Sequence, residues 1–418
     1  MIVLGIETSC DETSASVVRD GVELLSLVTA SSMDLHVAYG GVVPEIAARS
    51  HIESIIPVID QALHEAFPNA NPQMPTPDFD PWSKIDAIAV TYGAGLGGCL
   101  LVGVTTAKTL AITKNKPLYA VNHVEGHVYA NFITEISTEY GVRSTELSTT
   151  NNLVPRTSYL LPNKQPEFPI LALIVSGKHT QLVLFKDHFD YVVLGKTCDD
   201  AIGEAFDKVA KLLGLPYPGG PSVARSAKNG DPNKYKLPKS RLESPYDFSF
   251  SGLKTAVLRL AQEQIGEDFT FPSFNVAMRL TETQKCDIAA SFQHTAVETV
   301  VDKTILAFNE FGPKSVIIAG GASANQELRR QLQERLAKSQ ESRVKSHINE
   351  PRSDSGKMLN DKSMVNGKWS MENCLLFTDV KLCTDNGAMI AVLGYYKALK
   401  KQEPADPYTL DIEPSLKM

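Results

Sequence analysis

The feature that most constrains the fold of this chain is a pattern that occurs twice. Residues 2–6 form an apolar run, followed by the polar turn E-T-S-C-D-E and a second apolar run at 13–18. Residues 170–175 are followed in the same way by S-G-K-H and an apolar run at 180–185. Two apolar runs around a short polar turn predict a β-hairpin. Because the same device opens each half of the chain, the sequence predicts a duplicated α/β fold.

Helical patterns follow each predicted hairpin. Residues 44–66 have apolar positions about 3.6 residues apart, and Pro57 within them is expected to kink or divide the helix. Residues 201–213 have the same period, and Gly214 is a natural stop. The apolar run 316–319 leads into a pair of glycines and a further helix. Strands that lead through glycine turns into helices are typical of α/β proteins.

Composition excludes several classes of protein. The 418 residues, 43% of them hydrophobic, are enough for two or three domains. A formal net charge of −7 argues against a wholly basic nucleic-acid binder, although a local basic patch is compatible with it. The six cysteines form no C-x-x-C pair, which indicates a reducing compartment rather than a disulfide framework. No apolar run reaches eighteen residues, so we expect no membrane span.

Three stretches interrupt the alternation of strands and helices. Residues 67–81 hold five prolines and are expected to form an extended loop. Residues 134–168 and 337–373 are polar and lack apolar periodicity, so we interpret both as surface insertions. The sequence opens directly on the first predicted strand, and we expect no signal or transit peptide within it.

Two histidines four residues apart stand in A-V-N-H-V-E-G-H-V-Y. On a helix His123 and His127 would share a face, and two imidazoles can hold an ion at about 2.0–2.1 Å. The metalloprotease helix H-E-x-x-H needs a glutamate directly after the first histidine, but Val124 stands there. Glu125 points toward a different face. The pair predicts a metal site without the protease signature, and a structural role for it stays open.

A third metal ligand can come from L-C-T-D-N-G-A-M-I-A, residues 382–391. Asp385 precedes a probable helix and offers a carboxylate, although Asp385 or Thr384 could instead be the N-cap of that helix. Two imidazoles and one carboxylate leave coordination positions open for substrate. That ligand set is typical of a catalytic site rather than a closed structural one.

Several glycine-rich segments could lie against a nucleotide. Residues 92–98 formally satisfy G-x-G-x-x-G, but the acid that a dinucleotide site needs after the next strand is missing, so close strand-to-helix packing is favoured over contact with an anion. The turns 176–179, 218–221 and 319–325 offer backbone for contact with an anion, a ribose or a base. Asn325 could bind the base or the sugar, although a single Gly-Gly pair is more often a turn.

Charged residues supply the remaining candidates. Asp11 and Glu12 lie in the first predicted turn and have no local structural explanation. Asp199 and Asp200 precede a helix and are explained by its dipole. The basic segment 228–241 has Tyr235 among its lysines, which suits RNA but also suits a solvated loop.

Taken together, the motifs resemble one family, the TsaD family of tRNA threonylcarbamoyltransferases, over residues 2 to about 395 apart from the insertions. The motifs that carry the resemblance are I-E-T-S-C-D-E-T, Y-G-G-V-V-P-E, N-H-V-E-G-H, V-S-G-K-H-T-Q, D-D-A-I-G-E-A-F-D-K-V-A-K-L-L-G, Y-P-G-G-P, F-S-F-S-G-L-K-T, A-G-G-A-S-A-N and C-T-D-N-G-A-M-I-A. They occur in the family's order and are highly specific.

The resemblance implies an ASKHA fold, in which two actin- and Hsp70-like lobes surround a central cleft. We expect an N-terminal lobe at 1–125, with a helix at 390–400 packing back on it, and a C-terminal lobe at 126–418 that carries the insertions near 134–168 and 337–373. The implied reaction transfers a threonylcarbamoyl group from threonylcarbamoyl-AMP to N6 of adenosine 37 in tRNAs that read ANN codons, which forms t6A.

The resemblance also implies roles for particular residues. Asp11 and Glu12 occupy the positions of the family's first-turn acids, with a catalytic or substrate-orienting role. A divalent ion, zinc or iron, would be held by His123, His127 and Asp385. The donor adenylate would be held by Ile174, Val175, Ser176, Gly177, Lys178, Asp207, Gly220 and Asn325.

The chain departs from the family's pattern at two positions. Lys178 stands where the family usually has glycine, and its charge either faces the donor's phosphate or points to solvent. Ile174 stands where archaeal-type relatives have a tyrosine ligand, so we expect three protein ligands.

The motifs resemble those of the bacterial-type branch of the family. A bacterial-like core with these insertions resembles the mitochondrial paralogue of eukaryotes. The resemblance therefore implies a homodimer in the mitochondrial matrix, with a cytoplasmic location as the alternative. It also implies tRNA as substrate, a separate synthase for threonylcarbamoyl-AMP, and no membrane. A zinc metallo-endopeptidase and an ASKHA-type ATPase or kinase remain as alternative functions.

Overall fold

The computed structural model describes residues 1–68, 80–136, 145–146, 161, 164–348, 364–365, 368–369 and 375–418. Most of the three predicted interruptions, 67–81, 134–168 and 337–373, lies outside the described residues. Helix α10, Gln326–Ile348, is an exception because it continues into the third of them. Residues 337–348 are therefore helical, although their sequence has no apolar period.

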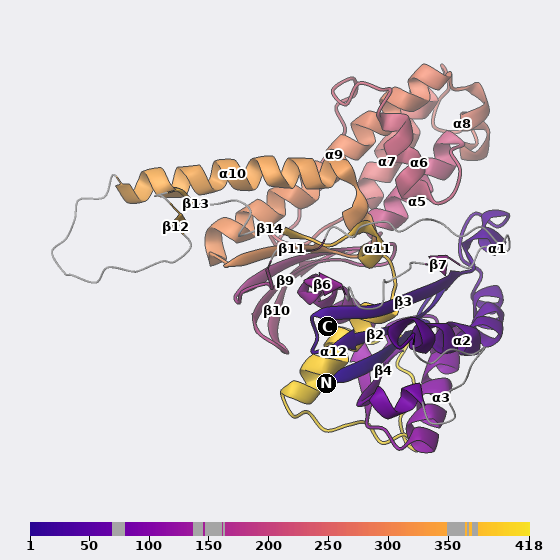
Figure 1. Cartoon of the computed structure of the whole chain (residues 1–418). Helices are drawn as coiled ribbons and strands as arrows, with labels where there is room; N and C mark the ends of the chain where they lie inside the picture. The colour runs from indigo at the N-terminus through magenta and orange to yellow at the C-terminus, as the bar shows by residue number, and fades with distance from the viewer. Residues whose placement is uncertain are drawn as a thin grey trace. The chain divides into compact units, whose positions relative to one another are not determined.

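The chain divides into two compact units (Figure 1). Unit 1 contains Met1–Gln165, Ala319–Gly321 and Phe377–Met418, and unit 2 contains Pro166–Ile318 and Ala322–Leu376. The boundary predicted at residues 125/126 falls inside helix α4, whereas the units divide near residue 165. No helix within the described ranges has an apolar stretch long enough to cross a lipid bilayer.

Unit 1 is built on one mixed sheet. Its strand order is β5-β4-β1-β2-β3-β6, and β7 also pairs with β3. Strands β1, β2 and β3 are antiparallel neighbours, whereas β4 runs parallel to β1 and β5 runs parallel to β4. The strands are β1 Ile2–Glu7, β2 Glu12–Arg19, β3 Glu23–Ser31, β4 Ala87–Gly93, β5 Leu118–Asn122, β6 Glu135–Ile136 and β7 Thr145–Glu146. The helical elements are α1 Met33–Val37, α2 Pro44–Ala66, η1 Pro81–Lys84, α3 Gly97–Lys114, α4 His123–Tyr129, η2 Ala130–Phe132, α11 Val380–Cys383 and α12 Gly387–Leu399.

Unit 2 repeats the same plan on its own sheet, whose order is β10-β9-β8-β11-β14. The strands are β8 Ile170–Val175, β9 Thr180–Asp187, β10 Asp190–Lys196, β11 Ser315–Ala319 and β14 Leu375–Phe377, and a separate hairpin pairs β12 Met364–Val365 with β13 Lys368–Trp369. The helical elements are α5 Ile202–Leu213, α6 Gly219–Ala227, α7 Ser251–Gln264, α8 Ser273–Arg279, α9 Glu282–Phe311, η3 Gly321–Ala324 and α10.

The two sheets confirm the predicted duplication. In each, the first three strands in chain order meander away from the middle of the sheet, and two later strands extend the other side; in unit 1 the short strands β6 and β7 also pair with β3. The first two strands of each set are the predicted hairpins, paired antiparallel from Ile2 to Arg19 and from Ile170 to Phe185. A strand order that recurs in two halves is the architecture of a duplicated α/β fold.

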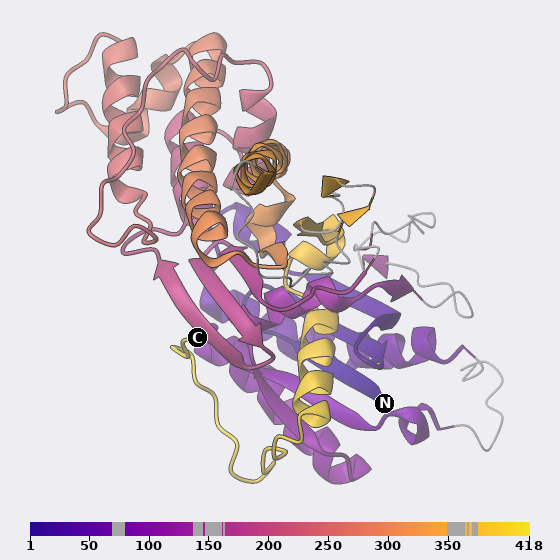
Figure 2. The same cartoon turned by 90° about the vertical axis from the view of Figure 1, so that its left-hand side faces the viewer.

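Helices cover both faces of the unit 1 sheet. Successive residues of a strand point to opposite faces. Leu4 and Ile6 of β1 belong to the core cluster that includes α2 and α3, whereas Gly5, between them, faces α12. Figure 2 shows α12, in yellow, lying along the sheet formed by the first strands. The last long helix thus completes the core of the first unit.

Two helix-ending signals behave differently from each other. Gly214 has a φ of +68° and ends α5, as predicted. Helix α2 runs unbroken through Pro57, so the expected division of this helix was wrong. Pro57 is exposed, and a proline on the solvent side of a long helix leaves the freed carbonyl accessible to water.

Gly5 should be among the least replaceable residues of the fold. A Cβ at this position would lie 2.1 Å from Gly387 O and 2.5 Å from Ala391 N, both backbone atoms of α12. We expect Gly5→Ala to lower the free energy of unfolding by about 3 kcal/mol, because the helix must move away from the sheet. Chemical denaturation measures this change. Gly252→Ala is the control, since no heavy atom lies within 4 Å of its Cβ; a comparable loss there would contradict the explanation.

Candidate functional site

Helix α4 presents the two predicted histidines on one face. The helix begins directly after β5, where Asn122 is the N-cap and its Oδ1 accepts hydrogen bonds from the N–H groups of Val124 and Glu125. His123 and His127 are one turn apart and buried, with ring centroids 4.7 Å from each other. The cap therefore sets the helix start that places both imidazoles together.

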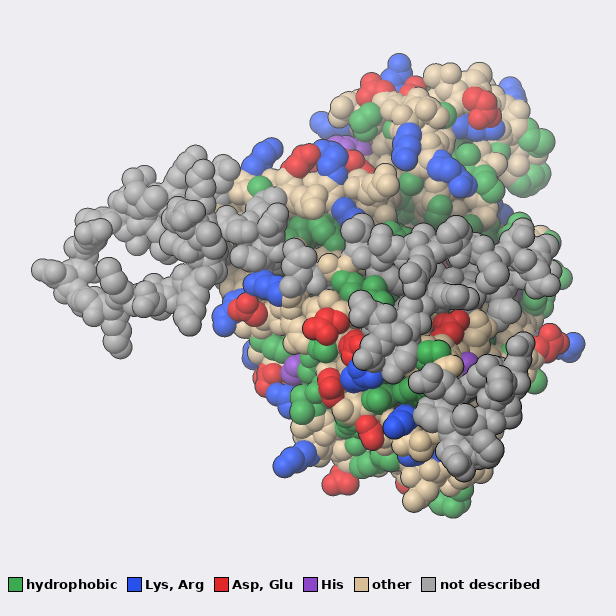
Figure 3. All heavy atoms as spheres, viewed as in Figure 1, with side chains coloured by type: hydrophobic (Ala, Val, Ile, Leu, Met, Phe, Trp, Pro, Cys, Tyr) green, Lys and Arg blue, Asp and Glu red, His purple; other side chains and the backbone are tan. Residues whose placement is uncertain are grey.

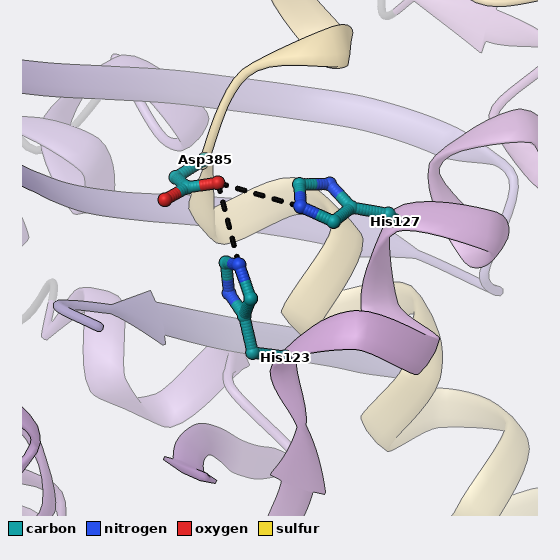
Figure 4. A group of neighbouring side chains, drawn as sticks. All are labelled: His123, His127 and Asp385. Carbon is teal, nitrogen blue, oxygen red and sulfur yellow. Dashed lines mark ion pairs between the residues drawn. The ribbon is translucent and has the colours of Figure 1, made fainter. Parts of the chain in front are cut away.

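Asp385 reaches the same point from the other end of the chain. It directly precedes α12, whose N-cap is Asn386, with Oδ1 accepting the Met389 N–H at 3.0 Å. Capping therefore does not explain Asp385. Its Oδ1 lies 3.4 Å from Nε2 of His123 and 3.5 Å from Nε2 of His127 (Figure 4).

These three side chains fit a metal ion. Their ligand atoms all lie within 4.8 Å of one another. Around a tetrahedral ion with bonds of about 2.0–2.2 Å, two ligand atoms are roughly 3.4 Å apart. The carboxylate–imidazole separations match that value, and two nitrogens with one oxygen suit several divalent transition metals.

Glu7, at the end of β1, orients the first imidazole. The carboxylate of Glu7 is fully buried and lies 3.2 Å from Nδ1 of His123. With its Nδ1–H donated to Glu7, His123 turns Nε2 toward Asp385. Burial raises the pKa of Glu7, but His123, Thr91 and Ser9 outweigh it and lower the pKa to about 2. A charged carboxylate behind a metal-binding histidine is a common second partner.

Sequence reasoning missed Glu7. The available signal was an acidic residue in the last position of an otherwise apolar strand, directly before the polar turn. An unpaired carboxylate would be costly at so buried a position, so its presence indicates a specific partner.

The acidic turn between β1 and β2 belongs to the same neighbourhood. Burial raises the pKa of Glu12 well above its usual range, and the carboxylates of Asp11 and Asp385 raise it further. Asp11 is buried, and its carbonyl accepts hydrogen bonds from the N–H and hydroxyl of Ser32. His51 also holds the turn, with Nε2 3.0 Å from Cys10 O. The turn is thus fixed from several sides, with two acids near the metal-ligand candidates.

In unit 2, the predicted nucleotide contacts divide between sheet and turn. Ile174 and Val175 are fully buried in β8, so only their backbone atoms can meet a ligand there. Ser176 organises the following turn: its Oγ accepts the N–H groups of Lys178 and His179 at 3.4 and 3.0 Å. Gly177 and Lys178 are exposed at the tip of this turn.

The other predicted nucleotide contacts of unit 2 are Asp207 within α5, Gly220 at the start of α6 and Asn325 before α10. Asp207 Oδ1 accepts the N–H of Gly219 at 2.7 Å, and burial raises the pKa of Asp207. A Cβ at Gly220 would meet no atom within 4 Å, so its backbone is open. Asn325 Oδ1 accepts the N–H groups of Glu327 and Leu328 at the start of α10, and its amide donates to Gln293. The side chain of Asn325 thus has a structural role that the sequence did not indicate.

The glycine-rich segment 92–98 packs against the end of the chain. The Glu413 N–H donates to Tyr92 O at 2.7 Å, and the Gly95 N–H donates to Pro414 O at 3.1 Å. A Cβ at Gly93 would lie 2.1 Å from Glu413 O. Of the two explanations for these glycines, close packing accounts for this contact.

Comparison with known proteins gives a consistent result. Residues 23–143 and 140–392 match the family TsaD, described as tRNA N6-adenosine threonylcarbamoyltransferase. A protein of that name from Thermomicrobium roseum is 47% identical over 345 residues, covering 80% of this chain and 84% of the relative. One from Dehalococcoides mccartyi strain BAV1 is 40% identical over 416 residues, covering 100% of this chain and 99% of the relative. Among solved structures, HypF of T. kodakarensis is 12% identical, with a TM-score of 0.49, over 98% of this chain and 49% of that one.

The duplicated sheet order is that of the ASKHA fold. Two matched segments that together cover residues 23–392, and relatives above 30% identity over nearly the full length, settle the membership. The chain belongs to the TsaD family of tRNA N6-adenosine threonylcarbamoyltransferases.

Proposed function

We propose that this chain transfers the threonylcarbamoyl group of threonylcarbamoyl-AMP to N6 of adenosine 37 in tRNAs that read ANN codons, which forms t6A. The observation that carries the proposal is the convergence of His123, His127 and Asp385 beside an acidic turn. Three protein ligands leave coordination positions for a substrate atom. Family membership supports the reaction, and the three converging side chains supply the proposed metal site for it.

A bound divalent ion, zinc or iron, would supply Lewis acidity that polarises the carbamoyl carbonyl. The protein's own part is to hold the ligands in place. Glu7 fixes the ring of His123, and Asn122 and Asn386 fix the helices that carry the ligands. Ligands held by such partners stay in position for the reaction.

The acidic turn would handle the proton of the acceptor. The exocyclic amine of adenine is a weak nucleophile, so a carboxylate that accepts its proton as the bond forms accelerates transfer. Glu12, whose pKa is raised, is held in its protonated form over a wider pH range and hydrogen-bonds Asp11. Asp11 is therefore the acid that we assign as general base.

The donor's adenylate is assigned to the turns of unit 2. Backbone N–H groups near Ser176–Lys178 and the open backbone at Gly220 suit a phosphate and a ribose. Lys178 is exposed. This exposure is compatible with a side chain that faces solvent and with one that faces the donor's phosphate. Asp207 holds the start of α6 beside Gly220, and we assign the backbone of Ile174 and Val175 and the segment at Asn325 to the same donor site.

The role of Glu7 gives a direct prediction. Glu7→Gln keeps the shape of the side chain but removes the negative charge that faces His123. We expect metal affinity to fall about 10- to 100-fold, the usual effect of losing such a partner. Competition with a chromophoric chelator measures this affinity without any activity assay. Glu23→Gln, at the start of β3 and away from the ligands, is the control; equal loss in both variants would contradict the assignment.

The proposed reaction is tested with purified protein, threonine, bicarbonate, ATP, an adenylate-forming synthase and an unmodified tRNA transcript. Nucleoside mass spectrometry should detect t6A, and a transcript with guanosine at position 37 should yield none. A sample that forms no t6A but cleaves protein substrates, or transfers phosphate from ATP to an acceptor, would favour one of the alternatives.

Three related expectations concern the protein's surroundings. The homodimer and the mitochondrial matrix stay predictions, as does the partnership with a separate synthase. Analytical ultracentrifugation tests the first. A fluorescent fusion of the native gene tests the second, and omission of the synthase from the assay above tests the third.

A further inference from the structure

The segment 225–241, here called the basic strap, joins the end of α6 to the region before α7. It carries six cations against a single acid, Asp231, in a chain whose formal net charge is −7. The cations are Arg225, Lys228, Lys234, Lys236, Lys239 and Arg241. Such a local excess of one charge can reflect either a solvated loop or a polyanion site, and the contacts of the strap distinguish them.

The strap is fixed along helix α9. The N–H of Asp231 donates to Asp287 Oδ1 at 2.9 Å, and the N–H of Tyr235 donates to Ser291 Oγ at 3.2 Å. Lys239 lies 2.7 Å from both Glu298 and Asp302. The helix positions from 287 to 302 span about 22 Å at 1.5 Å per residue. The strap is thus attached to the helix at every fourth residue, 231, 235 and 239, and is not a free loop.

Anchoring uses one side of the strap and leaves its charges on the other. Tyr235 is half-buried, and its hydroxyl donates to Gln264 Oε1 at 3.0 Å, so its ring belongs to the anchoring side rather than to a stacking surface. Its neighbours Lys234 and Lys236 are exposed. Both lysines therefore lie on the surface between the anchored residues 231 and 239, where a polyanion can reach their charges.

Two acids of helix α9 that lie beside the strap already form ion pairs. Glu298 and Asp302 pair with Lys239, and Asp302 also pairs with Arg335. Of the six cations, Lys239 is the one neutralised in this way. The other five are exposed, and within the described residues they make no ion pair. Figure 3 shows Lys and Arg side chains on the surface of the helical part of unit 2.

We infer that the basic strap binds the phosphate backbone of the tRNA substrate, with Lys228, Lys234 and Lys236 as its central contacts. This inference rests on the proposed function, which supplies a polyanionic macromolecule. Helix α6, which is nine residues or about 14 Å long, connects the strap to Gly220, an expected donor contact at its start. A tRNA held on the strap would therefore lie near the donor. Phosphate contacts of this kind position the nucleic acid and are independent of base sequence.

The test compares two triple variants of the full-length protein. K228Q/K234Q/K236Q removes three strap charges, and K84Q/K186Q/K401Q removes three exposed charges elsewhere. Binding of an unmodified tRNA transcript is measured by fluorescence anisotropy over a range of KCl concentrations. Each lost phosphate contact lowers the slope of log affinity against log salt by about 0.7–0.9. We expect the strap variant to lose about two units of slope and about tenfold or more in affinity, and the control variant to match the wild type.

A further variant checks the assigned orientation. K239Q removes a charge that already faces Glu298 and Asp302, so its tRNA slope should stay at the wild-type value. Circular dichroism confirms that each variant is folded. A strap variant that binds tRNA with the wild-type slope overturns the inference, as does an equal loss in both triple variants.

Failure of the inference is distinguishable from failure of the proposed function. If the wild type forms t6A and the strap variant binds tRNA normally, the inference about the strap is wrong and the proposed reaction is supported. If the wild type forms no t6A, the reaction itself is wrong. Loss of binding to anionic phospholipid vesicles with unchanged tRNA binding would assign the strap to a membrane and also overturn the inference.

Discussion

The Asp385→Asn variant is expected to lose bound metal and, with it, t6A formation. Asparagine matches aspartate in size, but its amide is neutral and a much weaker ligand. Asn386, not Asp385, caps α12, so the fold should be retained. The metal affinity should fall by more than the roughly 10- to 100-fold typical of residues behind the ligands. Elemental analysis after dialysis measures metal content, and nucleoside mass spectrometry measures t6A.

Asp411→Asn is the matched control, because Asp411 is an exposed acid of the same unit. It should keep both metal and activity. His123→Ala should behave like Asp385→Asn, since both remove one of the three converging ligand atoms. Full metal content together with normal t6A formation in either ligand variant would show that the three residues are not a metal site.

The parts of the fold that the sequence predicted correctly depend on local patterns. Both hairpins follow from apolar runs around short polar turns, and α5 ends at Gly214 because a residue with positive φ is needed there. The pairing of His123 and His127 follows from helical geometry alone. Asp385, more than 250 residues later, was a candidate third ligand from its carboxylate before a predicted helix, and the family resemblance then implied the full set of three ligands.

The parts that sequence reasoning missed depend on contacts between distant segments. Glu7 meets His123 across 116 positions, and nothing near Glu7 in the sequence reveals that pairing. Pro57 is tolerated within the helix because it faces solvent. The apolar periodicity alone did not predict that the helix would continue through it.

Side-chain roles were also harder to predict than side-chain positions. Asn325 and Asn386 stand in segments that suit a ligand site, yet both have oxygens that accept helix N–H groups. A short polar side chain before a helix can bind a ligand or cap the helix, and sequence does not distinguish these roles. Tyr235 likewise has the ring that RNA binding could use, but its hydroxyl anchors the strap to Gln264.

The Asp11→Asn variant should have the second large effect, a transfer rate lowered by about 10²- to 10⁴-fold. The amide cannot accept the proton of the attacking amine. The backbone carbonyl of Asp11, which accepts the hydrogen bonds from Ser32, is unchanged, so the turn should keep its shape. Single-turnover measurement with preformed threonylcarbamoyl-AMP isolates the transfer step. Metal content should match the wild type, which separates this effect from that of Asp385→Asn.

Glu12→Gln is the matched partner of this experiment, because Glu12 is the neighbouring acid and its raised pKa favours its protonated form. Burial and Asp11 are the largest causes of the raised pKa of Glu12, and both persist if a bound ion neutralises Asp385. A glutamine reproduces the neutral, hydrogen-bond-donating state of a protonated Glu12, so its transfer rate should stay within about tenfold of the wild type. If instead Glu12→Gln shows the larger decrease in transfer rate and Asp11→Asn stays active, Glu12 is the residue that accepts the proton. The acid with the raised pKa would then be the one matched to base catalysis near neutral pH.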